Sequence, residues 1–478
     1  MIDAPSTLAL FVLLAAPSTG AVLALVPYPA VTRAVARVAS LLTVGASLVL
    51  LGAAADERWG SFLGVDALSD VLLFTVTSIY ATSVWFSDGY LRSVHRPFLT
   101  PQLYYALLGA FAFTMIGALV VTDLGLMWIG IEATTVSSAL LIVLERRPTS
   151  VEAAWRYTLI ASAGLTIALF ALLLLYTDTG TLDAYRLASA PPAVTLPVEM
   201  AAALALVGYG TKVGLFPMHT WLPDAHSEAP SPVSAMFSGV LLPTALYAFL
   251  RVYRVLGTPA PAPIRELVVV FGLATALVGA FLLQRQRSYK RMLAYSSMEV
   301  MGLAVVGIAV GGIALYGALL LLVAHAFAKS AAFYCAGNVL GSTGTTRIDA
   351  VRDLRSTMPV TGGTWLVSAL AVTGAPPFGT FLGELLIVVG AVALGQYAVA
   401  ALFVLAILVA FVGVNGQVGR MVLGPATTGS EPAPAREERG AGVALLNVAF
   451  ALVLGVASLP YLSSAIRAAA ALFGGGAP

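Results

Sequence analysis

Apolar runs of about 18 residues or more recur along the whole sequence and constrain its fold more than any other feature. A helix of this length crosses a bilayer, and a soluble fold could not cover so much apolar surface. The first run, Leu8 to Val26, lacks the basic segment of a signal peptide, so we interpret it as a span. With 59% hydrophobic and 10% charged residues, the chain is predicted to be an all-α, polytopic membrane protein.

Polar loops divide the chain into about fourteen predicted spans of roughly 20 residues each. They are Leu8–Val26, Val31–Ala53, Ala67–Phe86, Leu103–Val121, Leu124–Leu144, Trp155–Tyr176, Met200–Pro217, Val233–Val252, Leu267–Leu283, Met292–Val310, Ile313–Leu340, Val360–Leu394, Tyr397–Leu423 and Val443–Leu459. The seventh contains Pro217, and the twelfth, which is too long for one straight helix, contains Pro376 and Pro377. Both are predicted to be broken helices, which lipid tolerates only where protein or water satisfies the freed backbone.

The chain is predicted to comprise three N-terminal helices (1–100), two five-helix units (101–256 and 257–424) and a polar loop with a last span (425–478). The broken spans occupy matching places in the two units, and each combines a Gly-x-x-x-Gly pattern, a helix break and one buried charge. This pattern is typical of transporters with inverted repeats. Because five is an odd number, the two units are predicted to be inverted relative to each other.

Lysine and arginine are distributed unevenly between two sets of predicted loops. Loops after odd-numbered spans contain seventeen of them, whereas loops after even-numbered spans, together with the C-terminus, contain six. Because cytoplasmic loops are enriched in Lys and Arg, both termini are predicted to lie on the non-cytoplasmic side. The regular alternation also supports the number of spans.

A few ionisable residues fall deep inside the predicted spans. They are Glu132, Lys212, Glu299, His325, Lys329 and Glu384. A charge at the centre of a bilayer costs about 2.5–3.5 kcal/mol, so each is expected to face the interior of the bundle. Two of the three lysines lie in spans, whereas no arginine is predicted deep in one. Because the pKa of lysine changes readily on burial and arginine keeps its proton, this pattern favours a proton relay over simple charge pairing.

A structural role is the alternative for each of these residues. A buried Glu132–Lys212 pair would fix the packing of two helices. Glu299 would contact the basic residues at the start of its span, and His325 would form a hydrogen bond between helices.

A short polar cluster follows Pro217 at the predicted membrane interface. It consists of His219, Asp224 and His226. We predict that these three residues cap a helix or fix a loop.

Several other functions are excluded by the sequence. Val207–Gly210 is similar to a potassium-channel filter, but it runs directly into a span and Lys212 would repel the ion. No strand or βαβ unit supports the adjacent glycines as a nucleotide site. The single cysteine, Cys335, cannot form a disulfide framework or a cysteine-held metal site, and the four histidines lack ligand spacing. We therefore predict that this chain binds no cofactor or metal, and its net charge of +2 indicates no nucleic-acid partner.

One family resemblance extends over nearly the whole chain. The segment KVGLFPMHTWLPDAHSEAPSPVSA at 212–235 resembles the antiporter-like proton-pumping subunits of complex I, Mrp antiporters and membrane-bound hydrogenases. Further similar segments are WIGIE at 128–132, KRMLAYSS at 290–297, HAFAK at 325–329 and PPFG at 376–379 with Glu384. Ser297-Met298-Glu299 and the glutamate at 384 are most similar to the formate-hydrogenlyase and hydrogenase-4 branch.

The resemblance implies a role for each matching position. Glu132 and Lys212 would form a pair whose opening and closure shift the proton affinity of the lysine. Lys329 with His325 would be the central relay, and Glu384 would exchange protons with the far side. The chain departs from the family at Pro243, where a lysine or histidine is common. Proton passage between Lys212 and Lys329 must then use water or another side chain, or be impaired.

We therefore expect a subunit of a multisubunit, redox-linked complex in the cytoplasmic membrane of a prokaryote. It would move protons or Na⁺, and its partners would be other membrane subunits, the lipid bilayer and a peripheral redox arm that holds the cofactors. Two alternatives stay open: an Mrp-type cation/proton antiporter subunit without a redox partner, and a structural membrane anchor with a degenerate relay.

Overall fold

The computed structural model describes residues 4–53, 57–94, 97–425 and 437–474. Arg96 and Arg436, which contribute to the count of basic residues, and most of the polar loop predicted at Ala426–Gly442 lie outside the described residues.

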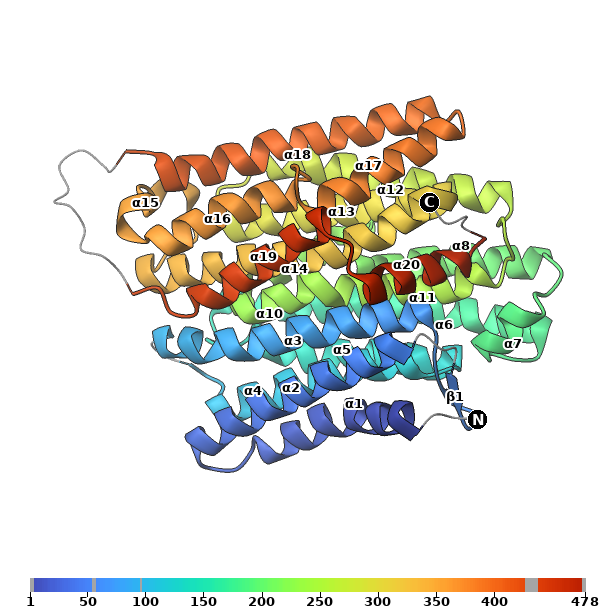
Figure 1. Ribbon diagram of the computed structural model, residues 1–478, viewed down its shortest axis with the longest axis horizontal. Coiled ribbons are helices and arrows are strands. Elements are labelled where there is room, and N and C mark those ends of the chain that lie inside the picture. The colour runs from blue at the N-terminus through green and yellow to red at the C-terminus, as the bar shows by residue number, and fades with distance from the viewer. Residues whose placement is uncertain (1–3, 54–56, 95–96, 426–436, 475–478) are drawn as a thin grey trace.

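Helices account for nearly all of the described secondary structure (Figure 1). The α-helices are α1 (Ala4–Leu23), α2 (Pro29–Ala53), α3 (Ala67–Ser93), α4 (Pro101–Val120), α5 (Leu124–Ile142), α6 (Pro148–Thr179), α7 (Ala184–Ser189), α8 (Leu196–Val213), α9 (Leu222–Glu228), α10 (Ser231–Met236), α11 (Leu242–Arg254), α12 (Ala262–Leu283), α13 (Tyr289–Val310), α14 (Gly312–Thr343), α15 (Leu354–Thr357), α16 (Pro359–Val372), α17 (Gly379–Ala393), α18 (Tyr397–Leu423), α19 (Ala441–Val456) and α20 (Pro460–Ala471). The shorter elements are the strands β1 (Glu57–Trp59) and β2 (Leu63–Val65), the 3₁₀ turns η1 (Met218–Trp221) and η3 (Ile348–Ala350), and the π-helical turn η2 (Phe237–Leu241).

The long helices run roughly side by side, with α15 at one end of the molecule and α7 and β1 at the other (Figure 1). In the described part of the chain, twelve helices are long and apolar enough to cross a membrane, or thirteen if the bent pair α19–α20 is one span. The shorter apolar helices α16 and α17 occupy the predicted twelfth span. The polytopic helical fold is confirmed, whereas the number of crossings and the inverted repeats stay predictions.

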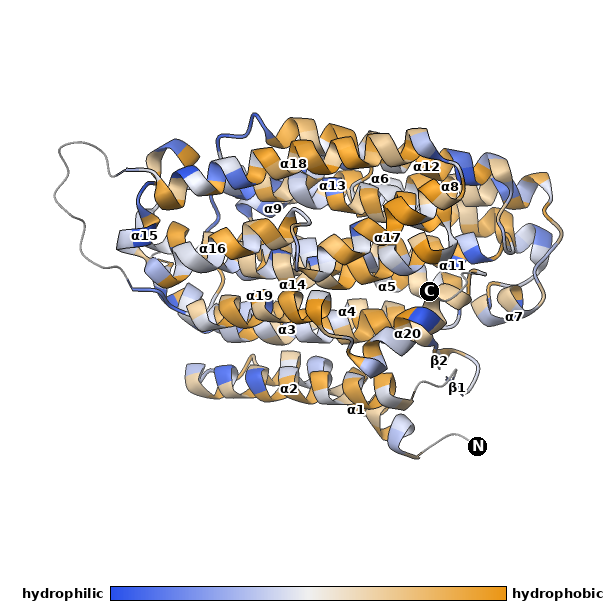
Figure 2. Cartoon of the chain, turned by 45° about the horizontal axis from the view of Figure 1, so that its top comes forward, coloured by the Kyte–Doolittle hydropathy of each residue, from blue (hydrophilic) through white to orange (hydrophobic). Residues whose placement is uncertain are grey.

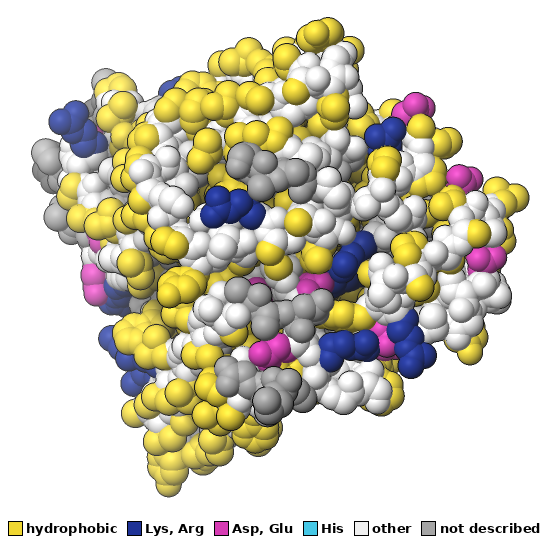
Figure 3. Space-filling model, turned by 45° about the vertical axis from the view of Figure 1, so that its right-hand side comes forward, with side chains coloured by type: hydrophobic (Ala, Val, Ile, Leu, Met, Phe, Trp, Pro, Cys, Tyr) yellow, Lys and Arg dark blue, Asp and Glu magenta, His cyan; other side chains and the backbone are white. Residues whose placement is uncertain are grey.

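Apolar residues cover the sides of the helices, and the more hydrophilic residues gather in loops and at helix ends (Figure 2). On the face shown in Figure 3, hydrophobic side chains dominate and charged ones lie singly or in small groups. The inner helices are α3, α13, α14 and the continuous span α10–η2–α11, whose residues are almost all buried. By contrast, α1, α2, α6, α12 and α18 expose more than half of their apolar windows, as a surface in contact with lipid requires.

Both predicted helix breaks are present. The first helix ends at Val213, before Pro217, and Gly214 follows with φ +85°. The second ends at Val372, Gly374 has φ +64°, and α17 begins at Gly379 beyond the two prolines. Each helix ends several residues before its proline for two reasons. Glycine readily adopts the left-handed conformation that ends a helix, and the residue before a proline disfavours the α-helical conformation.

Three features differ from an uninterrupted set of straight helices. Strands β1 and β2 form a short antiparallel hairpin between α2 and α3, because the backbone of this loop pairs with itself outside any helix. The π-helical turn η2 interrupts the eighth span before Pro243. Helices α19 and α20 are bent by 69° around Leu459 and Pro460, where proline cannot continue the preceding helix.

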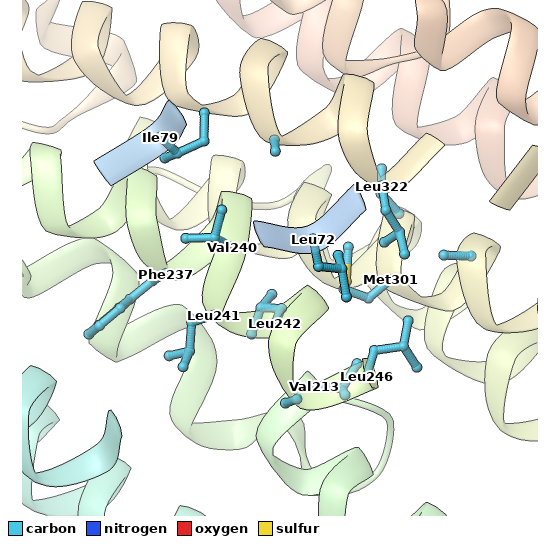
Figure 4. Close-up of a cluster of buried hydrophobic side chains, with 14 of the residues drawn as sticks. Leu72, Ile79, Val213, Phe237, Val240, Leu241, Leu242, Leu246, Met301 and Leu322 are labelled. Carbon is cyan, nitrogen blue, oxygen red and sulfur yellow. The ribbon is translucent and has the colours of Figure 1, made fainter. Parts of the chain in front are cut away.

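The inner helices meet in a tightly packed apolar cluster (Figure 4). The labelled side chains come from α3, α8, η2, α11, α13 and α14, and all are buried. The cluster includes α8, α13 and α14, which carry Lys212, Glu299 and Lys329, so these charges are held in a packed interior rather than at the lipid surface.

One arginine is buried in the bundle, although it lies in the last turn of its helix rather than deep in a span. Arg251 lies in α11 and is 5% exposed. Its guanidinium donates to both carboxylate oxygens of Asp66, at 2.5 and 2.7 Å, and to the hydroxyls of Ser69 and Tyr247. Arginine is tolerated there because a bidentate carboxylate and two hydroxyls replace its hydration.

Candidate functional site

Lys212 lies in the last turn of α8, where its side chain is completely buried. Its Nζ donates to Thr135 Oγ1 of α5 at 2.5 Å and to Tyr157 Oη of α6 at 2.7 Å. Tyr157 Oη is also 2.9 Å from Ser138 Oγ. Two neighbouring helices therefore hold this lysine with neutral oxygen atoms, and the last turn of α8 before the break carries it into the interior.

Glu132 lies on α5, one turn before Thr135, and is half-buried. One carboxylate oxygen accepts a hydrogen bond from Ser162 Oγ at 2.6 Å, and the other has no partner among the described residues. Glu132 interacts electrostatically with Lys212, but Lys212 donates to the two hydroxyls instead. The structure thus brings the predicted pair into one region without direct contact.

Lys329 lies in the middle of α14 and is completely buried. Its Nζ donates to Leu293 O and Ser296 Oγ of α13, both at 2.9 Å. His325 is one turn away on the same helix, and neither ring nitrogen has a hydrogen-bond partner among the described residues. Because buried polar atoms without a protein partner are typical water sites, this region is suited to hold water.

Glu299 lies on α13, one turn after Ser296, and is 2% exposed. It interacts electrostatically with Lys329. The alternative that Glu299 contacts the basic residues at the start of its span is wrong: Lys290 donates to Ala229 O, and Arg291 forms an ion pair with Asp224.

Glu384 lies in α17, in the second turn after the break that contains Pro376 and Pro377, and is 4% exposed. Its carboxylate lies against Gly374, because a methyl group added at Gly374 would overlap the carboxylate. Glu384 interacts electrostatically with Glu299. The broken helix therefore provides the space in which this carboxylate sits.

The polar cluster after Pro217 has two parts with different surroundings. Asp224 links Arg156 and Arg291 at the end of the bundle. His219 is buried in η1 beside the Phe216 ring, and His226 is completely buried. The ion pairs of Asp224 agree with its predicted role of fixing a loop. The complete burial of His226, by contrast, does not follow from its predicted place at the membrane interface.

His226 contacts three aromatic rings, those of Trp221, Phe237 and Phe333. Its Nδ1 lies 2.8 Å from Leu222 O, and its Nε2 has no hydrogen-bond partner among the described residues. The sequence places His226 in a polar loop, so nothing local signals this burial.

Pro243 lies in the first turn of α11, directly after η2, and is buried. This chain therefore has no basic side chain at this position of the eighth span. Nearby, Ser238 Oγ of η2 is 2.7 Å from Ser297 Oγ of α13. Ser297 donates to Leu293 O, and the same carbonyl accepts a hydrogen bond from Lys329. Sequence reasoning missed these hydroxyls, although serines in an apolar span were a signal.

The arrangement offers two buried amines, three carboxylates and two imidazoles, held by hydroxyls and carbonyls. Such groups exchange protons without any bound cofactor. In the described part of the chain, no group of three or more His, Cys, Asp or Glu is placed to hold a metal ion.

Comparison with known proteins identifies the family. Residues 121–410 match the model of the NADH:quinone oxidoreductase/Mrp antiporter transmembrane family. The chain belongs to this family. The matched region contains all six ionisable residues predicted to lie deep in spans, from Glu132 to Glu384.

Individual members of the family and one solved structure agree with this assignment. The chain is 36% identical to a hydrogenase-4 component F homolog of Methylacidiphilum infernorum over 350 residues, covering 70% of this chain and 73% of that protein. It is 33% identical to NADH-quinone oxidoreductase subunit N of Desulforudis audaxviator over 355 residues, covering 72% and 70%. A chain of the Mrp complex from Dietzia sp. DQ12-45-1b has the same fold, with a TM-score of 0.86, 22% identity and coverage of 99% and 98%.

Proposed function

We propose that this chain moves protons across a membrane through its buried side chains, as one subunit of a larger redox-linked complex. The observation that carries the proposal is that Lys212 and Lys329 are completely buried and bonded to neutral oxygens rather than to carboxylates. A permanent ammonium in the interior is costly without a carboxylate partner. A lysine held in this way is suited to release and regain its proton.

The proposed relay begins at Lys212. When the Glu132 carboxylate approaches Lys212, the protonated amine is favoured, and when Glu132 turns toward Ser162, release is favoured. The hydrogen bond from Ser162 to Glu132 corresponds to the second arrangement. From there the proton passes to Lys329, assisted by the hydroxyls of Ser238 and Ser297 and by water near His325. Glu299 and Glu384 then take it toward the opposite side.

The names of two relatives support the proposed partners. They are named as a hydrogenase-4 component and a subunit of NADH-quinone oxidoreductase. We propose that partner subunits carry the redox cofactors, that the complex resides in the cytoplasmic membrane of a prokaryote, and that both termini lie on the non-cytoplasmic side.

Transport by reconstituted protein tests the relay. In proteoliposomes that contain the complex, Lys212→Ala and Lys329→Ala are each expected to lower proton flux by about 10²-fold, as expected when a positioned proton carrier is removed. Arg467→Gln, a change at an exposed residue of α20, is the control and should leave flux unchanged. Undiminished flux in both alanine variants would contradict the proposal, and uptake of radioactive Na⁺ distinguishes the two ions.

An Mrp-type antiporter subunit without a redox partner is the second candidate, favoured by the structural similarity to the Mrp complex. Purification from native membranes separates the two. Co-isolation with iron–sulfur proteins supports the redox-linked complex, and an assembly of hydrophobic subunits alone supports the antiporter. A structural anchor, for which Pro243 is the main argument, predicts no loss of flux in either lysine variant.

A further inference from the structure

Two polar cavities lie side by side where α3 and α14 end. One, of about 410 Å³, is lined in part by Glu145 and Arg147. The other, of about 300 Å³, is lined in part by Asn338. Both share Tyr90, Ser93 and Gly341 in their walls. Their walls combine charged and polar side chains with apolar ones, which distinguishes them from the apolar groove lined by Phe74 and Phe450.

We propose that these cavities are the mouth of an access path that connects Lys329 with water through Lys290 and His226. This proposal rests on the proposed function, but it adds a route that reaches the central lysine without passing Lys212 or the position of Pro243.

Lys290 is the first group below the cavities. It lies in the first turn of α13, is 1% exposed, and donates to Ala229 O at 2.5 Å. Its ammonium interacts electrostatically with Glu228, Glu145 and Arg147, and the last two line the larger cavity. No carboxylate within 4 Å forms an ion pair with Lys290 in the described part of the chain. The chain has three lysines, and all three are therefore buried.

His226 is the second group. Its ring contacts Phe333, one turn after Lys329 on α14, and Lys290 donates to Ala229, three residues after His226. His226 is therefore close to both lysines, and it interacts electrostatically with each of them. Its Nδ1 faces the carbonyl of Leu222, whereas Nε2 is buried without a hydrogen-bond partner among the described residues. An imidazole with one nitrogen fixed and the other free can accept a proton on the free nitrogen and pass it on.

The proton balance along this route needs no other reactant. Lys290 donates a proton to His226. A proton that enters the cavity from bulk water then replaces it on Lys290. One N–H bond forms and one breaks at each group, and the final proton converts the Lys329 amine to the ammonium. Water in the cavity supplies the proton, and the charge of each intermediate group returns to its starting value. The aromatic rings around His226 limit the direct passage of other ions.

Cysteine labelling tests the mouth directly because the only native cysteine, Cys335, is buried and can be replaced. In a Cys335→Ala background, Ser93→Cys and, separately, Ser342→Cys place a thiol in the cavity wall. The full complex in proteoliposomes is treated with a positively charged methanethiosulfonate reagent, and proton flux is compared before and after labelling of the same variant. The matched control is Ser356→Cys, an exposed position after α14 that lines neither cavity.

A fixed positive charge in the mouth repels an approaching proton, so flux is expected to fall by about tenfold on labelling. A reducing agent that removes the label should restore it, and labelled Ser356→Cys should be unaffected. Full labelling of both cavity variants with unchanged flux would overturn the access path. If the unlabelled complex moves no protons at all, the proposed function itself fails, so the two failures are distinguishable.

Discussion

At the scale of single residues, the hydroxyl groups around Lys212 decide how this lysine is held. In the described chain, its Nζ donates to Thr135 and Tyr157, and both are neutral. In a Thr135→Val/Tyr157→Phe double variant the buried amine loses both oxygens, so the free energy of unfolding is expected to fall by about 1–3 kcal/mol. Proton flux should fall as well, because the ammonium is no longer solvated. Thermal unfolding in detergent and flux in proteoliposomes measure the two effects.

Thr166→Val is the control for that variant, since Thr166 is exposed on α6 and bonds only to the backbone of its own helix. An unchanged unfolding temperature in the double variant would show that water already solvates Lys212.

A second prediction at this scale concerns the buried pair of Asp66 and Arg251. Burial alone would raise the pKa of the Asp66 carboxyl, but Arg251 and the backbone of Ser69 outweigh it and hold the pKa below its ordinary value. A group whose folded pKa is depressed contributes stability above its unfolded pKa, near 4, and loses it as the pH falls through the folded pKa. Unfolding temperature should therefore drop below about pH 4.

Removing one partner of a buried pair costs about 3–5 kcal/mol, so Arg251→Gln should be strongly destabilised at pH 7. Its unfolding temperature should also respond less to acid than that of the unchanged protein. A pH profile identical in both proteins would contradict the role assigned to this pair.

At the scale of elements, the break between α16 and α17 is the feature that positions a buried carboxylate. Gly374 has φ +64°, and a methyl group there would overlap Glu384. Gly374→Ala is therefore expected to destabilise the protein by about 1–2 kcal/mol for the backbone conformation alone and to displace Glu384. Gly363→Ala, inside α16 with open space around it, is the matched control and should not destabilise the protein. Unfolding temperature and proton flux are the measurements.

Steric overlap with Glu384 is expected to contribute to this loss of stability. Gly374→Ala should then lower the unfolding temperature less in a protein that already carries Glu384→Ala than in the unchanged protein. Equal destabilisation in both backgrounds would leave backbone conformation as the whole cause.

The breaks could be predicted from the sequence because proline and glycine act locally on the backbone. The burial of Lys212 and Lys329 could be predicted because an ionisable residue in an apolar run has to face the interior. Their partners could not, since Thr135, Tyr157 and Ser296 come from other helices and depend on the packing. The same reason explains Arg251, whose partner Asp66 is far away in sequence.

At the scale of the whole molecule, ion pairs sort the loops into two groups. Asp88, at the end of α3, pairs with Arg33 and Arg37 of α2, and Asp224 pairs with Arg156 and Arg291. These contacts connect loops or helix ends that the alternation of spans places on one side. On the other side, Asp183 pairs with Arg58, and Asp66 pairs with Arg251 and Arg254. The arrangement agrees with the predicted alternation, whereas the side that faces the cytoplasm stays a prediction.

That side can be determined by reporter fusions. The start of α1 and the helix α20 both lie toward the end of the molecule that contains α7 and β1. This end is opposite α15 (Figure 1). Because the excess of Lys and Arg is at the α15 end, we expect that end to be cytoplasmic. Alkaline phosphatase, which is active only outside the cytoplasm, should be active when fused after Pro478 and inactive when fused after Gly424, which follows α18. A fluorescent protein that folds only in the cytoplasm should give the opposite pattern. The reverse result would place both termini in the cytoplasm. The cavities at the ends of α3 and α14 would then open to the outer side. The same fusions therefore also assign the side from which the labelling reagent reaches Ser93→Cys.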